Sequence, residues 1–203
     1  MTAGGFDDKV AIREVVENWV IWRDSGQWDR FRTLWHDGAR FHATWFRGSV
    51  EDFIANARRS FERGAIGCHF LGGSAIEVIG TRAIAQTKKR IDSRQTLDGI
   101  VCDVVCTGRF YQFFERREGR WAIVLHQGIY EKDRIDPVDP AAQLTLDPAL
   151  LAEFPVGYRH LAYCQTKAGH NVQRDLPGLH GAAVERLYAA GAAFLAGGPA
   201  DYE

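Results

Sequence analysis

The first sixty residues carry apolar side chains at helical spacing. One stripe runs through residues 7–24, which predicts an amphipathic helix, and Ser25-Gly26 is a typical end for it. The stripe consists of Ile12, Val15, Val16, Trp19 and Val20. We expect a second helix over residues 28–35, an alternating strand over 40–46, and a third helix from Ser49, its N-cap, to about residue 63.

The pattern changes to that of β-strands from Cys68 onward. Four long runs favour strands, at residues 68–80, 81–95, 100–117 and 120–134. The turn signals between them are Gly80-Thr81, Asp98-Gly99 and Glu118-Gly119, and such short connections join antiparallel neighbours. Helices followed by a strand meander indicate the α+β class, with the N-terminal helices packed on one face of a curved, mostly antiparallel sheet.

The chain after Asp136 has a different composition, because all six of its prolines lie there. Five of them separate short amphipathic segments, namely Pro137, Pro140, Pro148, Pro155 and Pro177. A final helix is expected over residues 182–195. We therefore divide the chain into a domain of residues 1–136 and a C-terminal helical extension of residues 137–203. The extension could close the mouth of a pocket, pack on the first domain or wrap a neighbouring subunit.

Length and charge limit the partners. A chain of 203 residues can bury one good core, and a net charge of -1 gives no electrostatic reason to expect nucleic acid or an anionic membrane. No apolar run is long enough to span a bilayer, and the N-terminus lacks a secretory pattern, so we expect a cytoplasmic protein.

A sheet covered on one side leaves its outer face to be buried, which favours a homo-oligomer, a dimer or trimer.

Metal and nucleotide signatures are absent from the sequence. The four cysteines form no CxxC pair, and the histidines show no ligand-like spacing, so no metal site is expected. Cys102 and Cys106 share one strand face, which favours apolar packing over a thiol nucleophile. Gly72-Gly73 opens no helix, so a bulge explains it better than a phosphate loop does.

Two side chains could carry proton chemistry. Asp24 continues the helical stripe inward, where a carboxylate near a helix C-terminus needs a cationic or hydrogen-bonding partner. His69 lies in an apolar strand, where an imidazole beside a carboxylate could act as a base. The alternatives are a solvated aspartate at a helix exit and a hydrogen-bonded core histidine.

Three segments give the chain a family resemblance over about residues 7–135. They are Asp24-Ser25-Gly26-Gln27-Trp28-Asp29-Arg30, His69-Phe70-Leu71-Gly72-Gly73-Ser74 and Glu118-Gly119-Arg120-Trp121. The chain resembles the nuclear transport factor 2-like superfamily, in its polyketide-cyclase-like branch with scytalone dehydratase and hexachlorocyclohexane dehydrochlorinase. The resemblance implies a cone-shaped α+β barrel and a lyase without cofactor or metal. In such a lyase His69 removes a proton from carbon, Asp24 orients the imidazole, and water, chloride or formaldehyde departs.

The sequence departs from the dehydratase pattern at several positions. The tyrosine before the aspartate is replaced by Arg23, and the inward tyrosine of the next strand falls near Ala43. The second pocket histidine falls near Asp92 or Ser93, and the family's serine and asparagine fall near Gly108 and Phe110. The absence of these residues indicates a different substrate, and it does not determine which group leaves.

Further residues are candidates for substrate binding. The aromatic candidates are Trp19, Trp45 and Phe110, which would suit a hydrophobic or aromatic molecule, although core filling explains them as well. Lys88, Lys89 and Arg90 follow one another on a strand, so at least one points away from the others and could enter the barrel as an anion or oxyanion partner. We select Lys88 and Arg90 for this role, and the alternative is a solvated basic edge. His126 and Tyr130 share a face with Gly128, which could leave room for a small molecule.

The sequence therefore predicts a cofactor-independent lyase that acts on a small hydrophobic or aromatic substrate through a His69-Asp24 pair. The alternative is a non-catalytic small-molecule-binding protein, or an assembly protein similar to an oxygenase small subunit, on the same scaffold. An isomerase or polyketide cyclase with the same base is a third option. A hydrogen bond between Asp24 and His69 would favour an enzyme, and a wide separation would favour a carrier.

Overall fold

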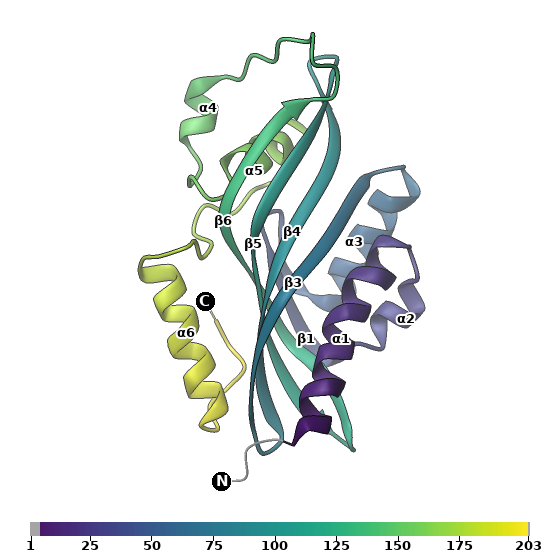
Figure 1. The fold of residues 1–203 in the computed structure, drawn as a ribbon, viewed down its shortest axis with the longest axis vertical. Helices are drawn as coiled ribbons and strands as arrows, with labels where there is room; N and C mark the ends of the chain where they lie inside the picture. The colour runs from purple at the N-terminus through teal and green to yellow at the C-terminus, as the bar shows by residue number, and fades with distance from the viewer. Residues whose placement is uncertain (1–4, 203) are drawn as a thin grey trace.

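The computed structural model describes residues 5–202 and has an α+β architecture built on one six-stranded sheet (Figure 1). In chain order the elements are α1 (Phe6–Asp24), α2 (Trp28–Arg32), β1 (Trp35–Ala43), β2 (Phe46–Ser49), α3 (Val50–Glu62), β3 (Ile66–Ile79), β4 (Arg82–Leu97), β5 (Ile100–Arg117), β6 (Arg120–Pro137), α4 (Pro148–Ala152), α5 (Arg159–Lys167) and α6 (Ala182–Leu195). The predicted fold class is confirmed.

The sheet has the strand order β2-β1-β6-β5-β4-β3. Every neighbouring pair is antiparallel except β1 and β6, which run parallel. The sheet is thus mixed and does not close on itself, since β2 and β3 are its two edges. Helices α1, α2 and α3 lie together on one side of the open sheet (Figure 1).

Helix α1 buries the apolar stripe that the sequence predicts. Ile12, Val16, Trp19 and Val20 are buried in the main core between the helices and the sheet. Helix α3 begins at the expected cap, because the Ser49 side chain accepts a hydrogen bond of 3.1 Å from the Asp52 backbone N–H.

The long strands are joined by two-residue turns. Asp98-Gly99 and Glu118-Gly119 each have positive φ at both positions, 48° and 84° in the first and 51° and 79° in the second. That backbone matches the twist of a tight hairpin and favours glycine at the second position. Gly72-Gly73 lies where the register of β3 against β4 shifts, between Leu71 and Ser74, as expected for a bulge.

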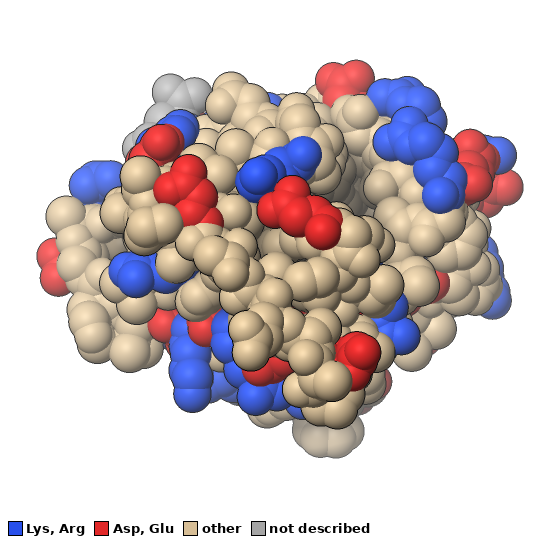
Figure 2. Space-filling view, turned by 90° about the horizontal axis from the view of Figure 1, so that it is seen from above, with Lys and Arg blue, Asp and Glu red and all other residues tan. Residues whose placement is uncertain are grey.

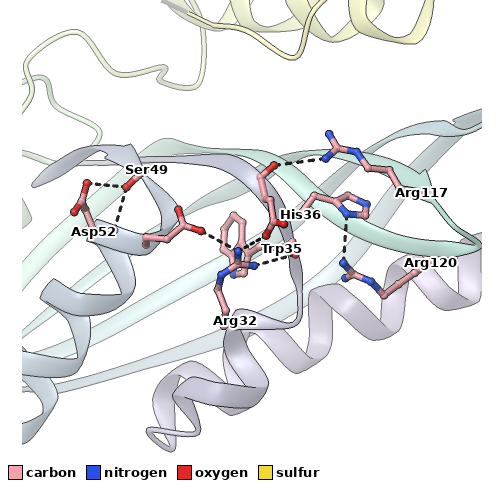
Figure 3. A network of polar contacts seen from close by, with 9 residues as sticks. Arg32, Trp35, His36, Ser49, Asp52, Arg117 and Arg120 are labelled. Carbon is pink, nitrogen blue, oxygen red and sulfur yellow. Dashed lines mark hydrogen bonds and ion pairs between the residues drawn. The ribbon is translucent and has the colours of Figure 1, made fainter.

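The junction of α2 and β1 differs from the prediction, because the helix ends at Arg32 and Trp35 already begins a strand. Trp35 pairs in register with Ile123 of the parallel strand β6, a contact that local spacing cannot show. The Arg32 guanidinium holds this junction (Figure 3). It donates to the Trp35 carbonyl at 3.2 Å and lies 2.6 Å from Asp37 and 2.9 Å from Glu51.

The C-terminal extension packs on both faces of the sheet. We call the face that bears His69 and Phe110 the inner face and the opposite one the outer face. Helix α5 packs on the inner face against Val104 and Cys106 of β5. Helix α6 covers part of the outer face (Figure 1), where Phe194 packs on Phe113 with ring centroids 5.3 Å apart. The chain itself therefore covers part of the face that was expected to need a second subunit, and the dimer or trimer stays a prediction.

The surface carries both signs of charge. Figure 2 shows Lys and Arg side chains interspersed with Asp and Glu on the face seen from above. Within residues 5–202, no helix is both long enough and apolar enough to cross a membrane.

Candidate functional site

A cavity of about 510 Å³ lies against the inner face of the sheet. Its walls come from α1, α3, α5 and all six strands of the sheet. Aromatic side chains form much of the lining, among them Trp19, Phe41, Trp45, Phe53 and Phe110. A cavity of this size and composition suits a small hydrophobic or aromatic molecule.

Asp24 and His69 form a hydrogen-bonded pair at this cavity. The Nδ1 atom of His69 lies 2.9 Å from Oδ1 of Asp24, and the His69 backbone N–H donates to Oδ2 at 2.6 Å. Asp24 is the last residue of α1 and His69 lies on β3, so the pair joins the helix layer to the sheet. The two bonds from one carboxylate fix the orientation of the imidazole.

Arg23 completes the support of the carboxylate. Its guanidinium donates to Asp24 Oδ1 at 3.1 Å and to the Gly67 carbonyl at 3.3 Å. Burial opposes ionisation of Asp24, but the hydrogen bonds and charges of His69 and Arg23 outweigh it and hold the Asp24 pKa below its usual value. Asp24 is therefore a carboxylate at neutral pH.

His69 lines the cavity with its ring packed against aromatic neighbours. Trp19 meets it edge to face at 5.2 Å between ring centroids, and Phe110 lies at 6.2 Å. Burial lowers the His69 pKa below its usual value, and the hydrogen bond to Asp24 offsets only part of this. The imidazole is therefore neutral at pH 7, with Nδ1 bonded to the carboxylate.

Most of the residues predicted to bind substrate line the same cavity. These are Trp19, Trp45, Phe110, His126 and Tyr130. Asp24 lies behind His69 and is not itself in the lining. The structure thus brings together residues from α1, β3, β5 and β6, together with Trp45 from the turn between β1 and β2.

Lys88 and Arg90 do not line this cavity, contrary to expectation. Lys88 Nζ lies 3.1 Å from Glu131 Oε2, and the exposed Arg90 forms an ion pair with Asp92 at 2.6 Å. Side chains alternate along a strand, so the residue between them, Lys89, points to the inner face and lines the cavity. Of these three basic residues, the middle one lines the cavity.

The space over Gly128 is not open. A side chain there would meet the Tyr130 hydroxyl at 2.7 Å, so the Tyr130 ring fills the room that the sequence suggested for a small molecule. The Tyr130 hydroxyl accepts a hydrogen bond of 3.2 Å from the Thr44 backbone N–H. His126 stacks on Phe41 at 4.6 Å between ring centroids, and burial lowers its pKa well below the usual value.

Two parts of the site were not among the residues selected from the sequence. Leu161, Gln165 and Ala168 line the cavity from α5 and the residue after it, whereas closing a pocket was only one of three options for the extension and named no residue. Lys89 could have been selected in place of Lys88 and Arg90, because the odd positions of β4 are the less polar ones. These are Ala83, Ala85, Thr87 and Ile91.

Metal ligation finds no support in the described part of the chain. Among residues 5–202 no three His, Cys, Asp or Glu side chains gather as a metal site requires. Burial raises the pKa of the Cys106 thiol to about 12, so this cysteine is a neutral packing residue.

Several fungal proteins are similar to this chain in sequence. Pea pathogenicity protein 2 of Fusarium vanettenii is 38% identical over 175 residues, which cover 84% of this chain and 75% of that protein. A second protein of the same fungus, a PEP2-like protein, is 36% identical with the same coverage. An uncharacterised protein of Emericella nidulans is 33% identical over 180 residues, or 84% of this chain and 76% of that one.

Solved structures with a similar fold include enzymes named for eliminations. A type 2 hexachlorocyclohexane dehydrochlorinase, LinA, superposes with a TM-score of 0.56 at 15% identity, covering 70% of this chain and 94% of that one. A proposed scytalone dehydratase from Novosphingobium aromaticivorans gives 0.54 at 12% identity, covering 68% and 95%. At these identities the likeness establishes the fold alone.

The family is established by the sequence itself. A model of the SnoaL-like domain matches residues 6–125, more than half of the chain. The matched part runs from α1 into β6 and holds both Asp24 and His69. The chain therefore belongs to the SnoaL-like domain family, within the nuclear transport factor 2-like superfamily.

Proposed function

We propose that this protein is a cofactor-independent lyase acting on a small hydrophobic or aromatic substrate. In the proposed reaction His69 removes a proton from one carbon and a leaving group departs from the adjacent carbon. The observation that carries the proposal is the fixed imidazole of His69, held by Asp24 through Nδ1 at 2.9 Å while its ring lines an aromatic cavity.

The protonation states suit a general base. Nδ1 of His69 donates to the Asp24 carboxylate, so Nε2 is the nitrogen without a proton, and it makes no hydrogen bond with the residues the structure describes. The lowered pKa keeps the imidazole neutral before the reaction. When Nε2 accepts the proton, the Asp24 carboxylate stabilises the imidazolium that forms.

The leaving group is left open among water, halide and formaldehyde. For formaldehyde, His69 would instead take the O–H proton of a hydroxymethyl group, and the electron pair of the broken C–C bond would stay on the substrate carbon. The dehydratase tyrosines are absent, since Arg23 binds Asp24 and Ala43 lines the cavity in their expected positions. Activation of a leaving hydroxyl by paired tyrosines is therefore not part of the proposal. The names of the structural neighbours, a dehydrochlorinase and a proposed dehydratase, agree with an elimination.

The hydrogen bond between Asp24 and His69 favours an enzyme over a non-catalytic carrier. A carrier needs a cavity but has no use for an oriented base, and a carboxylate buried beside an imidazole has a desolvation cost. The polar pair supports catalysis more than it supports binding of a hydrophobic ligand.

A screen for elimination products tests the proposal. Aromatic alcohols, halides and diaryl compounds would be incubated with the wild type, with His69→Gln and with Asp24→Asn. We expect the two variants to lose about 10²–10⁴-fold in rate, the usual contribution of a general base. His160→Gln is the matched control, because Asp133 holds His160 through the same two kinds of bond away from the cavity lining. Equal turnover by the wild type and His69→Gln would refute the proposal.

A further inference from the structure

Lys89 places a basic side chain inside the cavity without a counter-ion. The residue is 3% exposed and lies in the lining of the cavity. Within residues 5–202 it forms no ion pair, whereas its neighbour Lys88 binds Glu131 at 3.1 Å. A buried cation without a partner is costly, and such groups concentrate at functional sites.

The register of three strands explains how the Lys89 side chain reaches this position. Lys89 of β4 is paired with Gly108 of β5, which in turn is paired with Tyr130 of β6. Gly108 has no side chain, so the Lys89 side chain can cross it toward the Tyr130 ring. Lys89 Nζ lies 4.0 Å from the Tyr130 ring centroid and 5.6 Å from that of Phe110. These rings hold the cation in place but do not neutralise it.

The Lys89 ammonium shares its part of the cavity with the proposed base. His69 is paired with Ile91 of β4, two residues along the same face from Lys89. Phe110 lies beside both groups: its ring centroid is 6.2 Å from the centroid of the His69 ring and 5.6 Å from Lys89 Nζ. A molecule lying on Phe110 would therefore have the imidazole and the ammonium within reach.

Protonation favours an electrostatic role for Lys89. Burial lowers its pKa to about 8, and the charge of Glu131 offsets only part of that effect. At pH 7 the side chain is still mainly an ammonium, which can bind an oxygen that becomes negative during a reaction.

We propose that Lys89 is the oxyanion-binding residue of the cavity. The substrate would then be a carbonyl compound that loses the proton from its α-carbon, the carbon next to the carbonyl group. This inference rests on the proposed function and adds the substrate class, a carbonyl compound with a leaving group on the β-carbon. It also adds a catalytic residue that touches the reacting atoms.

The step balances without a co-reactant. The bond between the α-carbon and its hydrogen breaks, the proton goes to Nε2 of His69, and the electron pair forms an enolate whose oxygen contacts the Lys89 ammonium. The enolate then collapses: the carbonyl re-forms, a double bond forms between the α- and β-carbons, and the leaving group departs from the β-carbon with its bonding pair. The ammonium is the same before and after the reaction.

A substituted phenol tests the inference without turnover, because a phenolate resembles an aromatic enolate in shape and charge. The probe is 4-nitrophenol, whose ionised form absorbs at a longer wavelength than the neutral form. It would be titrated with the wild type, Lys89→Met and Lys88→Met at a pH below the probe's own pKa. The wild type should bind the phenolate and raise its absorbance, and Lys89→Met should weaken binding about tenfold or more and abolish ionisation. Lys88→Met, the exposed neighbour, should match the wild type.

Two results would overturn the inference. One is the same phenolate binding by Lys89→Met and the wild type. The other is loss of ionisation in His69→Gln together with its retention in Lys89→Met, which would place the anion on the imidazole. A second measurement needs no variant: in lysine-labelled wild type, NMR should show that 4-nitrophenol raises the Lys89 pKa, and an unchanged pKa would also overturn it. Because none of these readouts requires turnover, the inference and the proposed lyase activity can fail separately.

Discussion

The carboxylate of Asp133 accepts hydrogen bonds from both the backbone N–H and Nδ1 of His160, at 2.6 and 2.8 Å. The same arrangement joins Asp24 to His69, so it occurs twice among residues 5–202. His160 lies in the first turn of α5, and Asp133 Oδ2 also accepts from the Leu161 N–H at 2.9 Å. In this second pair, Asp133 of β6 therefore caps the N-terminal turn of α5. The proposed catalysis therefore depends on the hydrogen-bonded pair together with its position, because His69 lines the cavity and His160 does not.

We expect Asp24→Asn to lower the His69 pKa further. The hydrogen bond and the charge of Asp24 both raise that pKa against the effect of burial, and the substitution removes the negative charge. NMR titration of the His69 ring measures the shift. Asp133→Asn is the control and should leave the His69 pKa unchanged. A His69 pKa that does not move in Asp24→Asn would mean that the carboxylate does not act on the imidazole.

The protein should lose stability as the pH falls from about 6.5, because four buried histidines have a lowered pKa. They are His36, His42, His69 and His126. A histidine with a lower pKa in the folded state binds fewer protons there than in the unfolded chain. Its stabilisation is therefore complete above the unfolded pKa and is lost as the pH falls toward the folded pKa.

His42 allows a direct test of this acid sensitivity. Burial lowers its pKa from 6.5 to about 4. In His42→Gln the decrease in unfolding free energy between pH 6.5 and 4 should be smaller by up to about 3 kcal/mol, at about 1.4 kcal/mol per pKa unit. Urea unfolding across that pH range measures it. Parallel pH curves for the wild type and His42→Gln would contradict the prediction.

Asp133→Ala should detach α5 from the sheet. The Asp133 side chain is completely buried, and its removal leaves the donors of His160 and Leu161 without their acceptor. We expect a loss of about 3 kcal/mol in unfolding free energy. Asp136→Ala is the control, because its ion pair with Arg134 is exposed and its loss should cost about 1 kcal/mol or less. Similar losses in the two variants would show that Asp133 does not hold the helix.

Gly108→Ala should destabilise the sheet, whereas Gly73→Ala should not. A Cβ at Gly108 would lie 2.0 Å from the Ile129 carbonyl oxygen, a backbone atom that cannot move without disturbing β6. A Cβ at Gly73 meets nothing within 4 Å. We expect a cost of about 3 kcal/mol or more for the first and within about 0.5 kcal/mol for the second. Thermal unfolding of both variants measures this, and equal midpoints would contradict it.

Much of the fold follows from local periodicity in the sequence. The stripe on α1, the Ser49 cap, the four long strands and their glycine turns each depend on neighbours within a few residues along the chain. Asp24 and His69 could also be predicted from the sequence as candidate site residues, because the stripe points Asp24 inward and a carboxylate there needs a partner. The structure supplies that partner 45 residues away in the sequence.

Tertiary structure alone decided the rest. Trp35 joins a strand because it pairs with β6, and α5 lines the cavity because Asp133 of β6 binds its first turn; both contacts join segments that are distant in sequence. For Lys88, Lys89 and Arg90 the sequence determined that the middle side chain points away from the other two, since alternation is a property of the strand itself. Which face of the strand is buried depends on the helices packed against the sheet. Because α1, α3 and α5 pack on the inner face, the Lys89 side chain lies in the cavity between them and the sheet.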